Sequence, residues 1–497
     1  MMFELKNNNK IPKSWELSIL TKISAINPTV DLSHFDDETL ISFVPMPRVE
    51  VLTGKLDPTN LEKVGKIKKG YTRFQDGDVL FAKITPCMEN GKTALAVGLH
   101  GGVGAGSTEL HVLRPYSGIH NKYLLYFLLQ AAFRHDAQHH MSGAVGQKRV
   151  PLKYLEDSQI SVPPSKEQER IVDKIEQLFS DLDEGEALLK TVQKQLKTYR
   201  QSVLQAAVTG ELTKEWREQN KHRLESGEDL LKRILQFRRD IGKIKTLEPI
   251  NEFKQCPKSW ALLPMDHIGK WSGGGTPSKA NKSFWQGGDI LWVSPKDMKI
   301  DRISNSVDKI TNDAVNNSSA IMISAGSLLM VTRSGILRHS FPVAVAEIDL
   351  TINQDLKALS PVELINSYYL YFIMSAFQQQ ILHICSKDGT TVQSIEFDRL
   401  KRFYIPIPSL LEQEEIVSAL SDVFSKIDAL KDWCATELTR SSTLRQAILK
   451  SAFSGKLVPQ DPSDEPASEL LKRIQTERDV QPKPKAKIRK KKKAEVA

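Results

Sequence analysis

The chain repeats itself once, about halfway along its length. Residues 167–172 read EQERIV, and 245 positions later residues 412–417 read EQEEIV. The same offset relates IPKSWEL at 11–17 to CPKSWAL at 256–262, and SVLQAAVTGEL at 202–212 to AILKSAFSGKL at 447–457. One register that holds through a domain entrance, a helix start and a helix end is typical of a tandem duplication. The sequence therefore predicts two halves of the same design.

A long amphipathic helix follows the first copy of this motif. Apolar residues recur there with gaps of four and three, interrupted only by Gly185, which is a coiled-coil heptad pattern. Prolines at 163 and 164 precede the pattern and Gly210 follows it, so we expect one helix over 166–208, about 65 Å long at 1.5 Å per residue. The predicted seam residues are Ile171, Ile175, Leu178, Leu182, Leu189, Val192, Leu196, Tyr199 and Val203.

The second copy keeps the seam with a poorer middle, where Cys434, Glu437 and Ser441 take seam positions. We expect Trp433 and Leu438 to turn inward there. A helix with one apolar stripe is unstable alone in water, so the two helices are predicted to pair antiparallel. Bracing of each helix against its own domain, or homodimerisation, is an alternative that periodicity leaves open. The seam of this copy comprises Ile416, Leu420, Val423, Ile427, Leu430, Leu444 and Ile448.

The segments between the helices predict mixed α/β domains with short strands, many Gly and Pro turns, and one apolar helix each at 121–133 and 366–377. The predicted fold class is α+β, a tandem pseudo-twofold repeat of two such domains and an antiparallel coiled coil. Its predicted segments are a first domain at 1–165, a central helix at 166–210, a connecting helical segment at 211–252, a second domain at 253–409, a C-terminal helix at 410–455, and a terminal segment with a basic disordered tail at 456–497.

Composition narrows the class of protein. The net charge of +9 lies mostly in residues 483–497, which hold eight basic residues against one acidic; residues 1–165 hold 19 against 16, and residues 253–409 hold 16 against 13. The four cysteines are widely spaced, which suits a reducing compartment and provides no metal motif. The N-terminus has no apolar signal core, and the longest apolar run, at 123–133, is too short to span a bilayer. We expect a soluble cytoplasmic protein.

Several motifs together resemble one family. They are GDVLFAKITPCMENGKTAL at 77–95, SGGGTPSK at 272–279, FWQGGDILWVSPKD at 284–297 and LLMVTRSG at 328–335, with AAVTGELTKEWRE at 206–218 and SGKLVPQDPSDEPASELLKRI at 454–474 after the two helices. Their order along nearly the whole chain is similar to that of the DNA-specificity subunit of type I restriction–modification enzymes. The basic tail is the part that this resemblance explains least.

The resemblance implies a non-catalytic subunit that binds double-stranded DNA at an asymmetric bipartite site, with one recognition domain for each half. It further implies that the paired helices set the gap and dock two modification (methyltransferase) subunits, and that restriction/translocase subunits join for phage defence. S-adenosylmethionine, ATP and Mg would then belong to these partners, with no cofactor or metal bound by this chain and no membrane involved. Two recognition domains held at a fixed separation are expected to bind half-sites about one helical turn of DNA apart, because both half-sites then face the same side of the duplex.

The sequence shows no catalytic motif. The only adjacent prolines, in VPPS at 162–165, lack the flanking residues of an aminomethyltransferase loop. ENGKT at 89–93 imitates a phosphate-binding loop, but residue 86 is proline where glycine is required, and GGVGAG at 101–106 is expected to be a turn. His135 and His139 have the spacing of zinc ligands without the glutamate or a third ligand. Two alternatives stay open: a self-contained DNA methyltransferase or nuclease, and a coiled-coil protein adaptor that does not bind DNA.

DNA contacts are expected from Lys and Arg on phosphates, and from Arg, Asn or Gln on base edges. Trp285 and Trp292 could stack on bases, but core packing is the favoured interpretation. The tail is expected to add at most salt-sensitive attraction. The candidate DNA-binding residues are Lys68, Lys69, Arg73, Lys83, Asn90, Lys92, Lys148 and Arg149 in the first domain, and Lys279, Lys296, Arg333 and Arg338 in the second.

Overall fold

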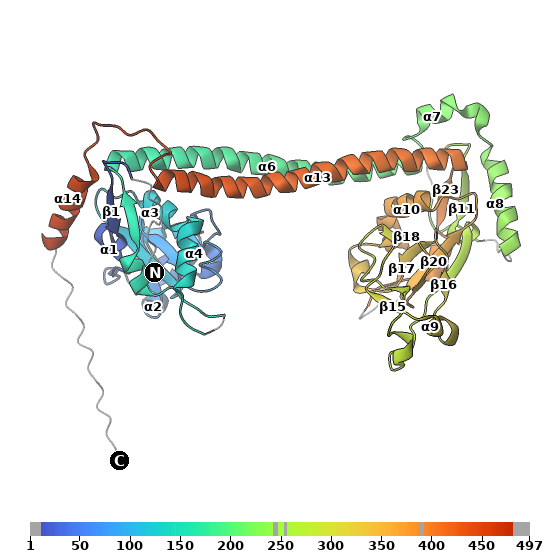
Figure 1. The fold of residues 1–497 in the computed structure, drawn as a ribbon, viewed down its shortest axis with the longest axis horizontal. Helices are drawn as coiled ribbons and strands as arrows, with labels where there is room; N and C mark the ends of the chain where they lie inside the picture. The colour runs from blue at the N-terminus through green and yellow to red at the C-terminus, as the bar shows by residue number, and fades with distance from the viewer. Residues whose placement is uncertain (1–10, 145, 242–246, 253–255, 388–391, 481–497) are drawn as a thin grey trace, which may run out of the picture. The chain divides into compact units, whose positions relative to one another are not determined.

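The structure, a computed structural model, describes residues 11–144, 146–241, 247–252, 256–387 and 392–480. The basic tail from residue 481 lies outside this range. The chain divides into two compact units: unit 1 is Met1–Leu189 with Thr436–Ala497, and unit 2 is Lys190–Ala435. Each unit contains one mixed α/β domain and a part of each long helix (Figure 1). No helix in the described ranges is both long enough and apolar enough to cross a membrane.

Unit 1 contains two four-stranded sheets. The first is antiparallel, with the order β2-β9-β6-β7; the second has the order β4-β3-β8-β5, in which β3 and β8 run parallel. Their strands are Ser24–Ile26 (β2), Leu40–Val44 (β3), Leu61–Lys63 (β4), Thr72–Gln75 (β5), Val79–Ala82 (β6), Thr93–Leu95 (β7), Val103–Gly106 (β8) and Leu110–Pro115 (β9). The shorter helices of the unit are Leu20–Ile23 (α1), Val64–Ile67 (α2), Asn121–Leu128 (α3), Ala131–His139 (α4), Leu152–Asp157 (α5) and Ala467–Val480 (α14), with 3-10 turns at Met46–Arg48 and His100–Gly102.

Unit 2 contains a five-stranded sheet with the order β12-β20-β17-β18-β14 and a four-stranded sheet with the order β15-β13-β19-β16. The strands are Gly269–Gly273 (β12), Ile290–Val293 (β13), Arg302–Ile303 (β14), Asp308–Ile310 (β15), Met322–Ile323 (β16), Leu328–Val331 (β17), Val343–Ala346 (β18), Leu350–Ile352 (β19) and Leu356–Pro361 (β20), with a small pair, Ser386–Lys387 (β21) and Ser394–Ile395 (β22). The shorter helices are Lys214–Gln219 (α7), Gly227–Ile241 (α8), Asn312–Asn317 (α9), Ser367–Ala376 (α10), Gln378–Cys385 (α11) and Phe397–Lys401 (α12), with 3-10 turns at Lys221–Arg223, Met265–His267, Lys282–Phe284 and Gly335–Arg338.

The duplication is visible in the strand pair at each domain entrance. In unit 1, β1 (Glu16–Ile19) pairs antiparallel with β10 (Gln159–Val162), and in unit 2, β11 (Ala261–Pro264) pairs antiparallel with β23 (Tyr404–Ile407). The registers correspond, since Glu16 faces Val162 and Ala261 faces Ile407. In both units a fully buried tyrosine hydroxyl donates to the second strand: Tyr123 to Ser161 O at 2.8 Å and Tyr369 to Pro406 O at 2.7 Å.

The apolar segment 121–133 is not the single helix that the sequence predicts. Helix α3 ends at Leu128, and α4 begins at Ala131 after an extended Gln130 (φ −62°, ψ 132°). The first amide of α4 donates to Gln446 Oε1 on the long helix α13 at 2.7 Å, which satisfies a donor that the break exposes. The counterpart in unit 2, predicted at 366–377, is one helix at Ser367–Ala376, so that prediction is confirmed.

The two long helices are α6 (Ser165–Thr209) and α13 (Leu410–Phe453), within two residues of their predicted bounds at 166–208 and 410–455. Each ends at a glycine with positive φ, Gly210 (φ +78°) and Gly455 (φ +69°). A Cβ atom at Gly210 would approach Pro257 Cγ to 2.5 Å, and one at Gly455 would approach Pro12 Cγ to 2.4 Å. Only glycine fits both the left-handed conformation and the close approach of the domain entrance.

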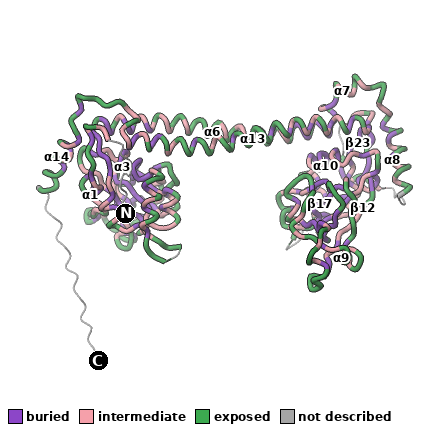
Figure 2. Tube along the Cα trace, viewed as in Figure 1, coloured by how far each residue is buried: buried purple, intermediate pink, exposed green. Residues whose placement is uncertain are grey.

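The long helices pair antiparallel in both units. In unit 1, Arg445 Nη2 lies 2.7 Å from Asp183 Oδ1, and Ser441 Oγ donates to Glu186 Oε1 at 2.7 Å. In unit 2, Arg200 Nη1 lies 3.4 Å from Asp428 Oδ1. Figure 2 shows buried positions concentrated inside the domains and only intermittent along the helices. The predicted intramolecular antiparallel pairing is confirmed.

Most predicted seam residues are buried or half-buried, but three are not. Tyr199, Leu430 and Leu444 are 54%, 47% and 46% exposed, and Trp433, expected to turn inward, is 54% exposed. Cys434 and Ser441 are buried at 0% and 8% exposure, so the small residues at the seam are accommodated without Trp433. A straight helix drifts from a strict heptad, so neighbouring residues make the interhelical contact in place of the predicted ones. Arg200 and Arg445, one residue after Tyr199 and Leu444, stack on phenylalanines of the opposite helix.

Candidate nucleic-acid interface

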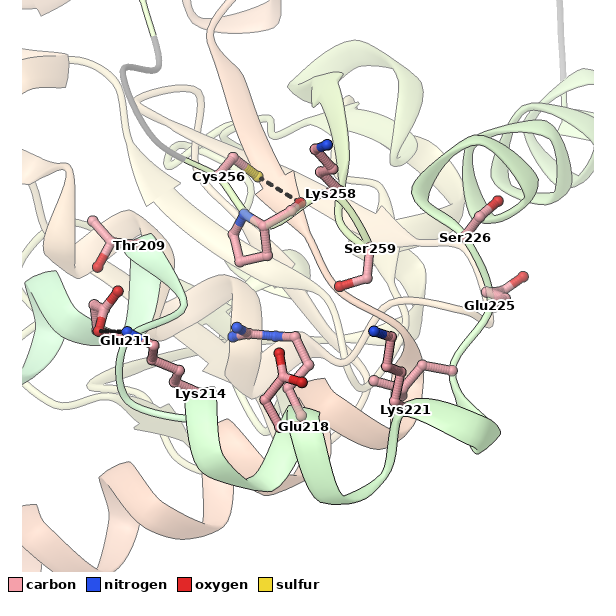
Figure 3. A pocket seen from close by; sticks show the side chains of 13 residues that line it. Thr209, Glu211, Lys214, Glu218, Lys221, Glu225, Ser226, Cys256, Lys258 and Ser259 are labelled. Atoms are coloured by element: carbon pink, nitrogen blue, oxygen red, sulfur yellow. Dashed lines mark hydrogen bonds and ion pairs between the residues drawn. The ribbon is translucent and has the colours of Figure 1, made fainter.

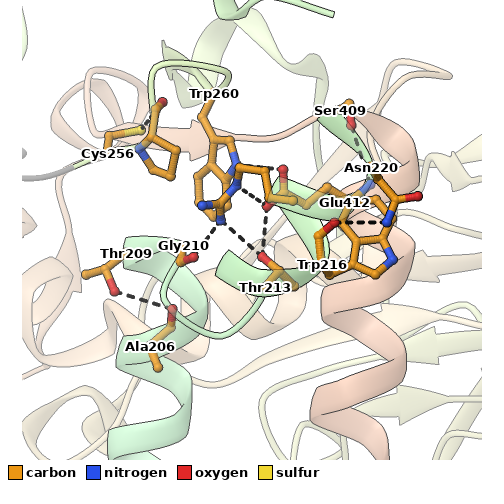
Figure 4. A network of polar contacts seen from close by, with 12 residues as sticks. Ala206, Thr209, Gly210, Thr213, Trp216, Asn220, Cys256, Trp260, Ser409 and Glu412 are labelled. Carbon is orange, nitrogen blue, oxygen red and sulfur yellow. Dashed lines mark hydrogen bonds and ion pairs between the residues drawn. The ribbon is translucent and has the colours of Figure 1, made fainter. Parts of the chain in front are cut away.

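A buried carboxylate from the repeated EQE motif joins each long helix to its domain. In unit 2, Glu412 is 1% exposed and accepts hydrogen bonds from Trp260 Nε1 at 2.9 Å, Thr213 Oγ1 at 2.8 Å and Arg217 Nε at 2.8 Å (Figure 4). Arg217 also donates to the carbonyl of Gly210 at 2.5 Å. A buried charge is tolerated when it is paired and fully hydrogen-bonded, so this network fixes the start of α13 to the end of α6.

The same glutamate in unit 1 has different partners. Glu167 is also 1% exposed, and it accepts a hydrogen bond from Gln460 Nε2 at 2.6 Å. The nearby ion pair is Arg170 with Asp464, at 2.6 Å. Burial raises the pKa of the Glu167 carboxyl. The partners from the segments that follow the two long helices differ because those segments differ in sequence, whereas Trp15, the counterpart of Trp260, also acts on Glu167 and lowers its pKa against the effect of burial.

The glutamine of each motif forms a hydrogen bond with the residue just before a helix of its domain, α3 in unit 1 and α10 in unit 2. Gln168 Oε1 accepts from His120 N at 2.8 Å, and its Nε2 donates to Pro163 O at 3.0 Å. Gln413 Oε1 accepts from Asn366 N at 2.8 Å, and its Nε2 donates to Pro408 O at 2.8 Å. The repeated Glu-Gln pair is therefore a structural junction that connects each long helix to its domain.

A cleft of about 1010 Å³ opens beside the unit 2 junction (Figure 3). Charged side chains of both signs line it, including Lys221, Lys258 and Glu218, and Lys214 lies 3.5 Å from Glu211. Burial raises the pKa of the Cys256 thiol to about 11, so this cysteine is not a reactive thiolate at neutral pH. The lining has neither a phosphate cradle nor a nucleophile with a base, and we assign it no catalytic role.

A braced loop extends from the first sheet of unit 1. Residues 83–92, here called loop 1, connect the antiparallel strands β6 and β7. The amide of Thr85 donates to Lys148 O at 3.0 Å, and the amide of Val150 donates to Lys83 O at 2.8 Å. The start of loop 1 is thus held as a short ladder against residues 148–150.

Unit 2 builds the same arrangement with different residues. Residues 332–342, here called loop 2, connect the antiparallel strands β17 and β18. The amide of Ser334 donates to Gln393 O at 3.1 Å, and the amide of Ile395 donates to Thr332 O at 2.8 Å. The bracing segments lie at the end of a short sequence echo, Gly143-x-x-x-Gln147 in the first half and Gly389-x-x-x-Gln393 in the second; the brace begins at Lys148 in unit 1 and at Gln393 itself in unit 2. Residues 145 and 389–391 of these echoes lie outside the described residues.

Six of the twelve predicted DNA-binding residues already have protein partners. Lys92 Nζ donates to the carbonyls of Met46 and Val49 at 2.8 and 2.9 Å, and Arg73 donates to the carbonyls of Val30 and Lys68. These two cations stabilise the domain from within. The other four form ion pairs: Lys68 with Asp37 at 2.6 Å, Arg149 with Glu109 at 2.8 Å, Lys296 with Asp308 at 2.7 Å and Arg333 with Asp355 at 2.7 Å.

The remaining six are available to a ligand to different degrees. Lys83 is half-buried beside Glu109 and Arg149, and burial lowers the pKa of its ammonium group. The other five are exposed, and within the described ranges their side chains form no hydrogen bond or ion pair; they are Lys69, Asn90, Lys148, Lys279 and Arg338. Asn90 lies in loop 1 itself, and the carbonyl of Lys148 accepts from the amide of Thr85 at the start of this loop.

Other motifs have structural roles. Trp292 is 6% exposed, donates to Gly275 O at 2.9 Å and packs edge-on against Trp285 with ring centroids 5.2 Å apart, which confirms core packing. His135 and His139 lie with ring centroids 4.6 Å apart, and the described residues contain no group of three or more metal-type ligands. GGVGAG at 101–106 is largely strand β8 rather than a turn, because its glycines let the strand pass close to Phe74 and Val44.

A contact between Glu89 of loop 1 and Arg134 had no sequence signal. Arg134, on α4, donates from Nη1 to Glu89 O at 2.6 Å. Arg134 Nε and Glu89 Oε2 are both buried and have no hydrogen-bond partner among the described residues. The contact joins positions 45 residues apart, so no local pattern could have predicted it.

The comparisons with known proteins agree with this architecture. The family model described as "Type I restriction modification DNA specificity domain" matches residues 2–194 and 257–436. The EcoAI specificity subunit of a type I restriction enzyme from Escherichia coli is 28% identical over 507 aligned residues, covering 90% of this chain and 83% of the relative. The EcoR124I/EcoR124II specificity subunit, also from E. coli, is 40% identical over 194 residues, covering 39% of this chain and 46% of the relative.

Solved structures show the same fold. A chain from a structural study of assembly and conformational transition in a type I R-M system matches with a TM-score of 0.68, 19% identity, and coverage of 90% of this chain and 99% of that one. The HsdS subunit from Thermoanaerobacter tengcongensis matches with a TM-score of 0.57 at 19% identity, covering 90% and 98%. With two matching domains that together span most of its length, the chain belongs to the type I restriction–modification DNA specificity family.

Proposed function

We propose that this chain is the sequence-reading subunit of a type I restriction–modification complex and recognises a bipartite, asymmetric DNA site. The observation that carries the proposal is the pair of family domains in one chain, each tied to the start of a long helix by the glutamine of the same repeated motif. The domains differ in their loops, while the glutamine hydrogen bonds of their junctions agree. That contrast suits one scaffold that presents two different readers to DNA.

The paired helices are the proposed spacer and the docking element for two modification subunits, to which restriction/translocase subunits are added. In this proposal the chain itself is non-catalytic. Methyl transfer with S-adenosylmethionine, and translocation with ATP and Mg, belong to the partner subunits. The four free thiols, two of them buried, suit the reducing cytoplasm where such a complex would act.

A domain exchange tests the proposal. Residues 16–150 are replaced by the equivalent segment of a relative with another site, and the sites methylated by the assembled complex are mapped. We expect one half of the recognised sequence to change and the other half to remain. A change in both halves, or in neither, would contradict the assignment of one half-site to each domain.

Two controls separate the alternative functions. The chain is incubated with duplex DNA and S-adenosylmethionine without other subunits; methyl transfer would identify a self-contained methyltransferase. The complex with modification subunits is titrated with duplex DNA at several salt concentrations. Failure to bind at low salt would favour a protein adaptor, because phosphate contacts strengthen as salt falls.

A further inference from the structure

Loops 1 and 2 occupy equivalent places in the two domains although their sequences differ. Each follows a fully buried strand, β6 or β17, and leads into the strand antiparallel to it. Each is braced by two backbone hydrogen bonds to the segment at the end of the Gly-x-x-x-Gln echo. Lys148 in unit 1 and Gln393 in unit 2 supply the equivalent carbonyl, and Val150 and Ile395 supply the equivalent amide. The brace is retained while the loop it supports has diverged from TPCMENGK at 85–92 to SGILRHSFP at 334–342.

We propose that loops 1 and 2 enter a groove of duplex DNA and read the bases, with Asn90 reading the half-site of unit 1 and Arg338 that of unit 2. This inference rests on the proposed function. It assigns the reading of each half-site to one loop and one leading side chain. A retained brace under a diverged loop is the pattern expected where only the specificity of a site changes between copies.

Loop 1 is held in one shape by bonds from several directions. The amide of Asn90 donates to Pro86 O at 3.0 Å and the amide of Gly91 to Met88 O at 2.9 Å, closing a turn. The amide of Leu52 donates to Gly91 O at 3.1 Å, so a second segment supports the turn. Lys92 and Arg134 fix both sides through backbone carbonyls. A side chain presented from such a turn reaches a base without a large ordering cost.

The chemistry at the tip of loop 1 suits adenine. The carboxamide of Asn90 is exposed and makes no hydrogen bond to any described residue, and it offers one acceptor and a donor group that match adenine N6 and N7. The adjacent Glu89 has a buried, unpaired Oε2, and Arg134, which donates to the carbonyl of Glu89, has a buried, unpaired Nε. Unpaired buried polar atoms are rare in folded proteins, and they are satisfied when a polar ligand or its water completes them. Lys148, exposed on the segment that braces the start of loop 1, offers a cation for a phosphate of the same duplex.

Loop 2 is equally ordered and offers a different side chain. Ser334 Oγ accepts from the Ile336 amide at 3.4 Å, and Arg333 is tied to Asp355 at 2.7 Å, so neither Ser334 nor Arg333 is free to read bases. Arg338 ends the 3-10 turn Gly335–Arg338, is exposed, and forms no hydrogen bond or ion pair in the part of the chain that is described. A free guanidinium pairs with guanine O6 and N7 through two hydrogen bonds. Ile336, 39% exposed on the same turn, can contact a thymine methyl group.

Selection from random DNA tests the inference. The full chain in complex with its modification subunits is mixed with a pool of duplexes carrying randomised positions, and the bound duplexes are sequenced. Asn90→Ala should relax one or two positions in one half of the consensus, with roughly 5- to 150-fold less discrimination there, and Arg338→Ala should do the same in the other half only. Arg338→Lys should lose the base preference while keeping most of the affinity, because lysine retains the charge without the planar fork.

The control is Lys279→Ala, which removes an exposed, unpaired cation outside both loops. It should weaken binding to all sequences equally and leave the consensus unchanged. Because the exposed side chains of Asn90 and Arg338 form no hydrogen bond or ion pair with any described residue, the loop variants should unfold at the wild-type temperature. A wild-type complex that selects no consensus would overturn the proposed function. A wild-type consensus that survives Asn90→Ala and Arg338→Ala, or that changes in the same half for both, would overturn the loop assignment alone.

Discussion

The guanidinium carbon of Arg200 lies 3.7 Å from the centroid of the Phe424 ring on the opposite long helix. The duplication repeats this contact in unit 1, where that of Arg445 lies 5.1 Å from the Phe179 centroid. Both arginines also approach an aspartate on the helix that carries the phenylalanine, Asp428 or Asp183. The Arg–Phe–Asp contact is therefore a duplicated element that specifies the register of the antiparallel pair, where the apolar seam alone is weak.

Removing this contact should loosen the pairing. Arg445→Ala deletes the stacking on Phe179 and the contacts to Asp183 and Glu186, at 2.7 and 3.1 Å. We expect the free energy of unfolding to fall by about 1–2 kcal/mol, most of it from the stacking, because Asp183 is 67% exposed and its ion pair is screened by solvent. Thermal unfolding would measure the change. Arg445→Lys should give an intermediate midpoint, and a wild-type midpoint for Arg445→Ala would contradict the assigned role.

The two motif glutamates should respond differently to neutralisation. Glu412→Gln removes the charge that pairs with the largely buried Arg217, so we expect a loss of about 2–4 kcal/mol. Indole fluorescence should report it, because Trp260 Nε1 donates to this carboxylate.

Glu167→Gln is the matched control in unit 1, where burial raises the pKa of the carboxyl. A carboxyl with a raised folded-state pKa contributes stability that is present at low pH and lost as the pH rises through that pKa. Neutralising Glu167 should therefore be tolerated or slightly stabilising near pH 7 and have no such benefit near pH 4. Equal destabilisation by both substitutions at pH 7 would show that the two junctions do not differ as described.

His111 should make unit 1 sensitive to acid. It is 5% exposed, and burial lowers its pKa from 6.5 to about 4. Its Nδ1 faces the amide nitrogen of Asn27 at 3.1 Å and its Nε2 faces Val150 O at 3.3 Å, which fits a neutral ring protonated on Nε2. Since Asn27 Oδ1 accepts from Val112 N at 3.0 Å, a second ring proton would point at a donor.

The depressed pKa sets the pH window. The stability due to neutral His111 is present above pH 6.5 and is lost progressively as the pH falls to about 4, by up to about 3 kcal/mol. Thermal unfolding between pH 7.5 and 4.5 measures this loss, and His111→Gln should flatten the profile across that range. Because Val150 also braces loop 1, sequence discrimination in one half-site should weaken in the same window. An unchanged slope in the variant would exclude His111 as the source.

The spacer proposal predicts a change in the recognised gap. Inserting one heptad at matched positions in α6 and α13 preserves the seam and lengthens the pair by about 10 Å. At 3.4 Å per base pair, we expect the gap to grow by about three base pairs with both half-sites retained. Methylation mapping of the assembled complex measures the gap. An unchanged gap in a complex that still assembles would contradict the spacer role.

The amino-acid sequence by itself determined the duplication, the two long helices and their ends. Helical periodicity and the stop at Gly210 are local signals, and the repeat of Glu-Gln after 245 residues, from 167 to 412, is legible without coordinates. It also predicted the core role of Trp292 and the helix at the end of the second domain. The sequence-based prediction of one helix over 121–133 was wrong because a distant residue stabilises the break before Ala131: the amide of Ala131 donates to Gln446, more than 300 residues later in the chain.

The tertiary structure alone decided which of the candidate DNA-binding side chains are free. Lys92 and Asn90 lie two positions apart in one loop, yet Lys92 donates to carbonyls 46 and 43 residues away, while Asn90 remains exposed without a side-chain partner among the described residues. The same holds for Arg333, paired with Asp355, and Arg338, which is unpaired within the described ranges. A hydrogen-bonding side chain is committed by groups that the fold brings to it from distant parts of the chain. Composition and residue spacing therefore cannot predict which side chains those distant groups will bind.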